Sequence, residues 1–255
     1  MSDEFYIGYQ AKTPPSLGKW ISRVSLSLIA VAAAISVLVI RTQDSFYPST
    51  FEFGIIRSYE GIYSDHPGPS IVVRDENNPD HPTTFLLVSE GKFGFNRTSR
   101  AASSALQSGV KILLDGTLIR RDEVRMLEVV AGSLRQAPDT TTDVWIPPTE
   151  YVGKRRVTGE IVDSKCFLGV MNPGDKTVHR ACARLCIRGG IPPMLHLDSA
   201  IEGASYILIT GEDGESINEQ VLPFVASPVE ITGELFRTGD LYELRVAAGS
   251  VTLLD

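Results

Sequence analysis

The sequence predicts a mainly β fold, in which an N-terminal transmembrane helix precedes two tandem OB-like small β-barrel domains. Three observations predict it: an uncharged apolar run near the N-terminus, many short β-branched runs separated by turn residues, and a pattern of residues that occurs twice. The predicted parts are a tail at 1–19, a transmembrane helix at 20–41, a first domain at 42–136, a linker at 137–150 and a second domain at 151–255. The second domain carries a Cys/His helical insertion at 160–191.

The apolar run extends from Val24 to Ile40 without a charged residue. With Trp20 and Ile21 added, it approaches the length of about 20 apolar residues that spans a bilayer. A cleaved signal peptide normally has a shorter apolar core that lies nearer the N-terminus. We therefore expect a membrane anchor that is not removed.

Basic residues lie mainly before this run: Lys12, Lys19 and Arg23 precede it, whereas Arg41 alone follows closely. Positive charge stays on the cytoplasmic side of a membrane. The expected location is therefore the bacterial inner membrane, crossed once, with a cytoplasmic N-terminus and the bulk of the chain in the periplasm. Disulfides are permitted in that compartment.

Five β-branched runs follow the anchor, separated by clusters of Gly, Pro, Asn and Asp. They predict strands at 51–57, 70–74, 84–88, 110–120 and 124–130. The small and polar residues at 99–109 predict a helix between the third and fourth strands, ended by Gly109. This order of elements is typical of a small OB-type barrel.

The second domain repeats the end of the first. The segments Gly116–Ser133 and Gly233–Ser250 align without a gap and share identical residues at many positions. The matched pairs are Gly116 and Gly233, Leu118 and Leu235, Arg120 and Arg237, Leu127 and Leu244, Val129 and Val246, and the two Ala-Gly-Ser triplets. Upstream, 85–88 corresponds to 206–209 and Gly54 corresponds to Gly159. A duplicated β fold is the simplest explanation.

The two copies differ in the connection between their first two strands, which is much longer in the second copy. All three cysteines of the chain lie in that longer connection, and the first copy has none. A fold that needed thiols merely to hold together would need them in both copies. The insertion is therefore expected to have a specialised role.

The second half of the insertion has the pattern of a helix. Asp175 or Thr177 can cap its start, and Gly189 and Gly190 can end it in the left-handed conformation open to glycine. A flexible loop precedes the helix and allows Cys166 to fold back onto it.

Within this helix, His179, Cys182 and Cys186 have the spacing i, i+3, i+7, which places them on one stripe. A neighbouring stripe carries Arg180, Arg184 and Arg188. The arginines are expected to contact a partner, either an acidic protein surface or an anionic cofactor.

Three interpretations of the cysteines remain open. Cys166 forms a disulfide with Cys182 or Cys186, which would stabilise the fold by about 2–4 kcal/mol. Alternatively, Cys166, His179, Cys182 and Cys186 bind zinc or copper. His196 in the following strand is then either a further ligand or a hydrogen-bonded residue of the barrel. In the third interpretation two of the thiols form a redox-active pair whose thiolate is stabilised by the arginines.

Several other functions are not indicated. The net charge is −7 and the sequence pI is about 5.2, and no strand interleaves aromatics with lysines, so no nucleic-acid partner is expected. The chain has no Gly-rich phosphate loop, nucleophile elbow or His-Glu-x-x-His helix. Glu160 and Asp163 are expected to be solvated charges. An independent catalytic activity is therefore not expected.

Certain residues carry a resemblance to known proteins. The segments GEIVDSKC and HRACARLCIRGGIPP, with Pro173 and Gly174 between them, resemble a motif of uncharacterised bacterial membrane-anchored proteins that occur beside redox enzymes. The order of tail, span and OB-like barrel is similar to that of periplasmic haem chaperones, although their haem-attaching His-Tyr motif is not matched. The spacing of Cys182 and Cys186 resembles the dinuclear copper site of cytochrome oxidase and its copper chaperones.

The expected function is that of a single-pass, membrane-anchored periplasmic accessory subunit of a redox or electron-transfer complex, with other membrane subunits as partners. In that role the Cys/His site serves metal or redox chemistry. One alternative is a structural assembly subunit with one stabilising disulfide and no cofactor. Another is a metallochaperone or dithiol redox protein.

Overall fold

The computed structural model describes residues 13–42, 48–74, 78, 81–95, 106–137 and 146–254. The chain divides into two compact units, Met1–Phe46 and Tyr47–Asp255. The part of the predicted helix at 99–105 and most of the predicted linker at 137–150 lie outside the described residues, as does most of the tail at 1–19.

The first unit contains the helix α1 (Pro15–Thr42), whose described side chains are all unburied. It covers the predicted apolar span and is the one helix in the described part of the chain that is long and apolar enough to cross a membrane, with a mean hydropathy of 2.3. The structure therefore agrees with an N-terminal segment that can serve as a membrane anchor.

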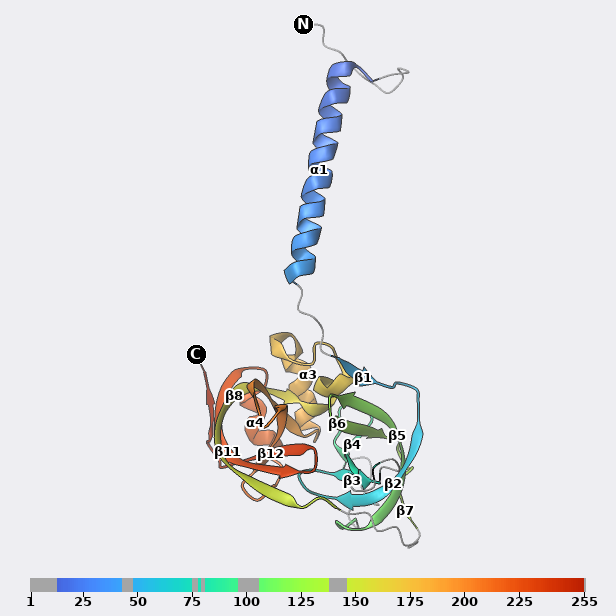
Figure 1. The fold of residues 1–255 in the computed structure, drawn as a ribbon, viewed down its shortest axis with the longest axis vertical. Helices are drawn as coiled ribbons and strands as arrows, with labels where there is room; N and C mark the ends of the chain where they lie inside the picture. Colours follow the sequence, from blue (N-terminus) through green and yellow to red (C-terminus); the bar gives the residue numbers. More distant parts are fainter. Residues whose placement is uncertain are drawn as a thin grey trace. The chain divides into compact units, whose positions relative to one another are not determined.

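The second unit is mainly β and contains two sheets (Figure 1). Sheet A is built from β1 (Ser49–Phe51), β2 (Arg57–Ser64), β3 (Ser70–Val73), β4 (Thr83–Ser89), β5 (Lys111–Arg121), β6 (Val124–Val129) and β7 (Arg135–Gln136). The sequential pairings β5–β2–β3–β4–β6 and the additional pairing β6–β5 close five of these strands into a barrel, in which β4 and β6 run parallel.

Sheet B contains β8 (Thr149–Asp163), β9 (Pro193–Ile201), β10 (Ala204–Gly211), β11 (Pro228–Thr238), β12 (Leu241–Val246) and β13 (Val251–Leu253). Its pairings run β12–β10–β9–β8–β11, and β12 also pairs with β11. The short helix α4 (Asn218–Val221) and a 3-10 turn (Leu222–Phe224) connect β10 to β11.

One predicted strand is wrong in its position. The stretch 51–57 is apolar enough to resemble a strand, but Glu52–Ile56 form a turn and the barrel strand is β2, which begins at Arg57. Gly54, which the sequence matches with Gly159, lies in this turn, whereas Gly61 of β2 and Gly159 of β8 have similar surroundings. Each lies against the backbone of the next strand, since a Cβ would lie 2.3 Å from the Val72 oxygen or 2.1 Å from the His196 oxygen.

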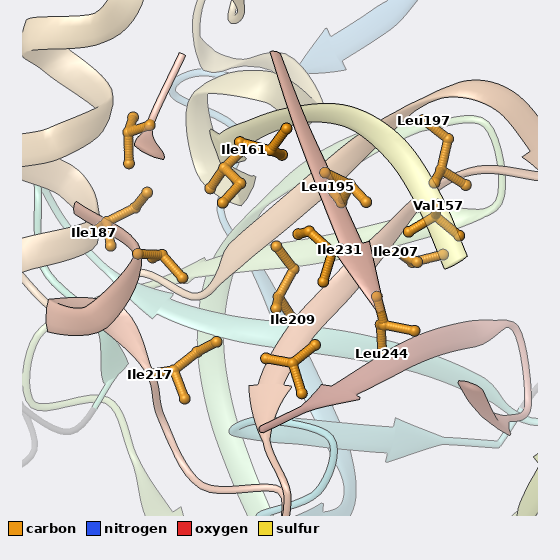
Figure 2. Packing of buried hydrophobic residues seen from close by; sticks show 14 of the residues in the cluster. Val157, Ile161, Ile187, Leu195, Leu197, Ile207, Ile209, Ile217, Ile231 and Leu244 are labelled. Carbon is orange, nitrogen blue, oxygen red and sulfur yellow. The ribbon is translucent and has the colours of Figure 1, made fainter. Parts of the chain in front are cut away.

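The segment between β8 and β9 contains the turn Cys166–Val170 and the helix α3 (Lys176–Arg188), whereas residues 160–163 of the predicted insertion belong to β8. Ile187 and Ala183 of α3 belong to the apolar core of sheet B (Figure 2). A different core cluster contains Cys166, Phe167 and Cys186 together with residues of sheet A such as Met126. The insertion therefore joins the cores of the two sheets.

Candidate metal or thiol site

The site begins where β8 ends. Asp163, the last residue of that strand, is fully buried, and its Oδ1 accepts a hydrogen bond of 2.8 Å from the backbone N–H of Cys166. Gly174 allows the following loop to fold closely over this turn, because a Cβ there would lie 2.7 Å from the Cα of Phe167. The sequence thus bends the chain so that the Cys166 thiol points back toward α3.

The helix α3 presents the predicted stripe. His179 and Cys186 are buried and Cys182 is half-buried. Asp175 occupies the N-cap position, but its side chain makes no capping hydrogen bond and instead lies 3.5 Å from Nδ1 of His196. At the other end only Gly190 is left-handed, with φ +101°, whereas Gly189 has a helical φ of −71°.

The predicted ligand residues come together. One potential ligand atom each from Cys166, His179 and Cys182 lie within 4.8 Å of one another, and the same limit holds for Asp163, Cys166 and Cys186. Cys166 belongs to both groups. The three cysteines are free and form no disulfide. The cluster could hold a metal ion.

His196 is placed differently from these residues. It is half-buried, its ring centroid lies 4.8 Å from that of Phe167, and it belongs to neither group of potential ligands. Burial lowers the pKa of His196. Its contacts with Phe167 and Asp175 indicate a packing role beside the site.

The position of Asp163 differs from the one expected from the sequence. It was expected to be a solvated charge, but it is fully buried, and its Oδ2 lies 3.0 Å from Nε2 of the buried His179. Such a carboxylate fixes the orientation and tautomer of a histidine and leaves the second ring nitrogen for another partner. Glu160 is also partly buried and accepts a hydrogen bond from the N–H of Lys176, and burial raises its pKa.

The residue that sequence reasoning missed is Lys92, in the turn after β4 of sheet A. Its Nζ lies 2.7 Å from Sγ of Cys182 and 4.0 Å from Sγ of Cys186. Lys92 lies far from the cysteines in sequence, so no local sequence pattern around it predicts this contact. The hydrogen bond with Cys182 raises the pKa of Lys92, so the side chain stays cationic beside the thiols.

The pKa values of two of the cysteine thiols are shifted in opposite directions. The pKa of Cys186 is lowered, foremost by the hydrogen bond with Cys166 and further by the Lys92 cation. The pKa of Cys166 is raised by the same hydrogen bond and by burial. Cys186 is therefore the more acidic thiol of this pair, and Cys166 is the group that keeps its proton.

Replacing Lys92 by glutamine is expected to raise the pKa of Cys186 in the metal-free protein. Removal of the nearby cation disfavours the thiolate, so less of it is present at a given pH. The ultraviolet absorbance of the thiolate, followed through a pH titration, measures the change. Lys154→Gln, at an exposed lysine of β8, is the matched control; an unchanged titration in K92Q would contradict the role of Lys92.

The turn that carries Lys92 is fixed by residues of the insertion. The buried Lys165 donates hydrogen bonds to the backbone oxygens of Ser89 (2.9 Å) and Gly91 (2.8 Å), and it pairs with Glu128. The N–H of Gly94 donates to the oxygen of Gly189 at 3.1 Å. The contacts on the two sides of Lys92 therefore tie the turn to Lys165 and to the end of α3.

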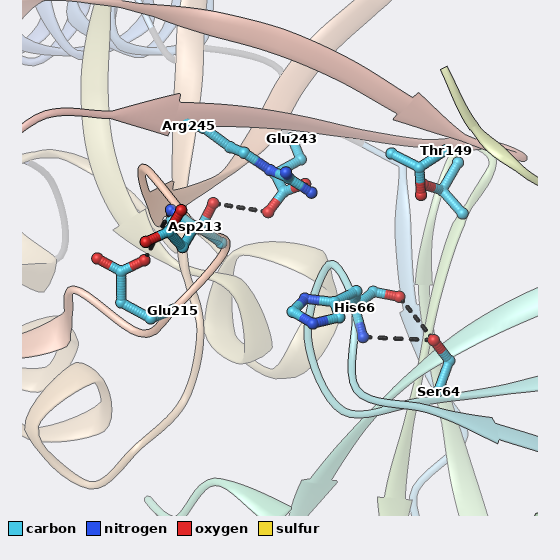
Figure 3. A network of polar contacts seen from close by, with 9 residues as sticks. Ser64, His66, Thr149, Asp213, Glu215, Glu243 and Arg245 are labelled. Carbon is cyan, nitrogen blue, oxygen red and sulfur yellow. Dashed lines mark hydrogen bonds and ion pairs between the residues drawn. The ribbon is translucent and has the colours of Figure 1, made fainter. Parts of the chain in front are cut away.

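A second polar network lies where loops of the two sheets meet (Figure 3). Thr210 donates a hydrogen bond of 2.6 Å to the buried carboxylate of Glu243, which also pairs with Arg245 at 3.1 Å. His66 of sheet A lies beside the turn at Gly214, where a Cβ would come within 3.1 Å of its Nδ1. The hydrogen bonds of Thr210, Glu243 and Arg245 lie within sheet B and those of His66 are to Ser64, and none of these residues offers a soft ligand like those of the cysteine cluster.

The three arginines do not form one exposed stripe. Arg180 is half-buried and donates hydrogen bonds to the backbone oxygen of Ala226 (2.7 Å) and to Oγ of Ser227 (3.0 Å). Arg184 and Arg188 are exposed. The structure thus assigns Arg180 an internal contact and leaves the other two on the surface.

Comparisons with protein-family models, curated proteins and solved structures give no significant match to this chain.

Proposed function

We propose that this chain is a membrane-anchored accessory protein of a redox complex that holds one zinc or copper ion at Cys166, His179, Cys182 and Cys186. The observation that supports the metal site in this proposal is the convergence of Cys166, His179 and Cys182, whose potential ligand atoms lie within 4.8 Å of one another. Cys166 also lies within the same distance of Cys186 through the second group. Three thiolates and one imidazole form a soft ligand set that suits either metal.

The surroundings of the four residues favour a bound cation. In a tetrahedral zinc site with Zn–S bonds of about 2.3 Å, neighbouring sulfurs lie about 3.7 Å apart. Cys166, His179 and Cys182 are already within 4.8 Å of one another, and Cys186, which is grouped with Cys166, has to join them when the ion binds. Three thiolates exceed the charge of a divalent ion by one unit, and Lys92 at 2.7 Å from Cys182 offsets it. Asp163 supplies the carboxylate that commonly orients a metal-binding histidine.

The proposal includes two tandem OB-like barrels. In support, sheet B has the same succession of pairings as sheet A: three consecutive antiparallel strands, a parallel pairing of the third with the fifth, and a fourth strand that pairs with the first and the fifth. Gly116 and Gly233, matched in sequence, both lie against the backbone of the last strand of this order. Only the second barrel carries the insertion.

The anchor and its orientation complete the proposal. α1 spans the bacterial inner membrane, with Lys19 and Arg23 toward the cytoplasm. The second unit, Tyr47–Asp255, is called the β unit below and lies in the periplasm. Arg184 and Arg188, both exposed on the ligand-bearing helix, face an acidic surface of another membrane subunit. A copper ion held by the four residues would supply electron transfer to that partner, whereas a zinc ion, which has no redox chemistry, would maintain the shape of the contact.

The full-length chain, purified in detergent under reducing conditions, tests the metal site. Elemental analysis is expected to find about one zinc or copper ion per chain, and the three thiols are expected to react with a thiol reagent only after a chelator is added. A chain that stays metal-free after exposure to either ion, with thiols that react equally with and without chelator, would disprove the site.

Replacing Asp163 by asparagine is expected to weaken metal binding about 10–100-fold, because the amide no longer orients His179 as the carboxylate does. Competition with a coloured chelator measures the affinity. Asp198→Asn, at an exposed position of β9, serves as the control. Equal affinities of the two variants would show that Asp163 has no part in the site.

A dithiol redox function is the second candidate, and a specific contact favours it. Cys166 and Cys186 share a hydrogen bond, and Lys92 stabilises the thiolate. In this function the Cys186 thiolate attacks a small-molecule disulfide such as oxidised glutathione and displaces one glutathione thiolate; Cys166 then attacks the mixed disulfide, which forms the Cys166–Cys186 bond and releases the second glutathione. Reversible loss of two thiols in a glutathione redox titration of the metal-free chain, with a defined midpoint, is the result this function requires.

A further inference from the structure

An exposed apolar tip follows the first strand of the β unit. Between β1 and β2, the side chains of Phe53, Ile55 and Ile56 are 82%, 49% and 59% exposed. The ring of Phe53 lies 5.5 Å from that of Phe51, which packs against the core cluster of the cysteine segment. Phe51 thus links the tip to the core, while the three large apolar side chains of the tip, which lie within four residues, face water.

Such a concentration of apolar side chains usually marks a contact surface. Transfer of apolar surface out of water contributes about 25 cal/mol per Å², so covering this tip is favourable. Arg120, an exposed residue of β5, is paired across the sheet with Thr50 of β1. Apolar side chains with a neighbouring cation match the interface of a bilayer that contains anionic lipids.

The length of the chain restricts where this tip can go. α1 ends at Thr42 and β1 begins at Ser49. Seven residue steps extend over about 25 Å at most. If α1 crosses a bilayer, the tip remains within reach of the headgroup layer, and the tether raises its local concentration there to about the millimolar range. Weak apolar insertion is then sufficient.

We propose that Phe53, Ile55 and Ile56 insert into the interfacial layer of the bilayer that α1 crosses, so that the β unit lies on the membrane surface in one orientation. This inference rests on the membrane anchoring in the proposed function. The docked strand β1 adjoins the cysteine segment, because a Cβ on Gly169 would lie 2.6 Å from the backbone oxygen of Thr50. Docking therefore holds the Cys166 turn close to the lipid surface, where an integral membrane partner can reach it.

Tryptophan fluorescence of the full chain tests the docking. Trp20 and Trp145 are replaced by phenylalanine, Phe53→Trp is introduced, and the protein is reconstituted into vesicles of phosphatidylcholine and phosphatidylglycerol with or without brominated acyl chains. The expected result is a blue-shifted emission that brominated lipid quenches. Tyr151→Trp, at a position of sheet B that is 58% exposed, is the matched control and is expected to remain unquenched.

Two further outcomes separate the docking from the anchor. If the chain floats with the vesicles in a density gradient but Trp at position 53 is unquenched, or if both tryptophans are quenched alike, the docking is overturned and the anchor stands. If the chain does not float, the anchor fails and the docking fails with it. Adding Ile56→Asp to the Phe53→Trp protein is expected to reduce the quenching, and no reduction would also overturn the docking.

Discussion

Replacing Cys166 by serine is expected to abolish stoichiometric zinc or copper binding by the full-length chain. Cys166 belongs to both groups of potential ligands, so its loss disrupts each of them. A serine hydroxyl is a hard, protonated group that does not replace a thiolate for these ions. Because loss of a mere orienting partner lowers affinity about 10–100-fold, loss of a direct ligand should exceed about 100-fold.

Chelator competition and elemental analysis of the purified variant measure this effect. His196→Gln is the matched control, since His196 lies beside the site, on Phe167, but outside both ligand groups. The control is expected to keep its metal. If C166S retained the metal with the affinity of the unchanged protein, the ligand assignment would be wrong.

Replacing Gly189 by alanine is expected to destabilise the β unit by about 3 kcal/mol or more, at the upper end of the cost of overpacking. Gly189 has an ordinary helical φ of −71°, so alanine is not strained by its own backbone. Its Cβ, however, would lie 1.8 Å from the backbone oxygen of Lys92. The backbones must separate, which moves Lys92 away from the thiols.

Thermal unfolding of the full chain in detergent, followed by the circular dichroism of its strands, measures the loss. For a unit of this size, about 3 kcal/mol corresponds to a fall in Tm of about 6–12 °C. Gly68→Ala is the control, because a Cβ there meets only a side-chain carbon of Pro192 at 4.0 Å. A Tm for G189A equal to that of G68A would show that the close approach of the two backbones is unimportant.

The helical stripe of His179, Cys182 and Cys186 could be predicted from sequence because it depends on spacing within one regular element. The place of the insertion between two strands could be predicted as well, from the uneven lengths of the two repeated segments. Both inferences use local periodicity or internal alignment, and neither requires knowledge of how the sheets pack.

Lys92 and Asp163 could not be identified in this way. Lys92 reaches Cys182 only because Lys165 and the Gly94–Gly189 contact hold its turn against α3. Asp163 looks like any carboxylate near the end of a strand, and its burial depends on the chain that folds over it. Tertiary packing determines both positions.

The error at 51–57 has a different cause. The apolar residues of that stretch resemble those of a buried strand, but here Phe53, Ile55 and Ile56 remain on the surface. Side-chain hydrophobicity predicts burial only on average, and a surface that contacts lipid or a partner violates that average.

The position of Lys92 on the first sheet has a consequence for assembly of the protein. A ligand that binds the thiols more tightly when Lys92 lies beside them stabilises the contact between the two sheets. The stabilisation is its binding free energy, RT ln(1 + [L]/Kd). Ligand binding and association of the two sheets are therefore thermodynamically coupled. A newly synthesised chain whose second half has not yet folded has no complete site for such a ligand, and a chain without the ligand is expected to be cleaved first by a protease.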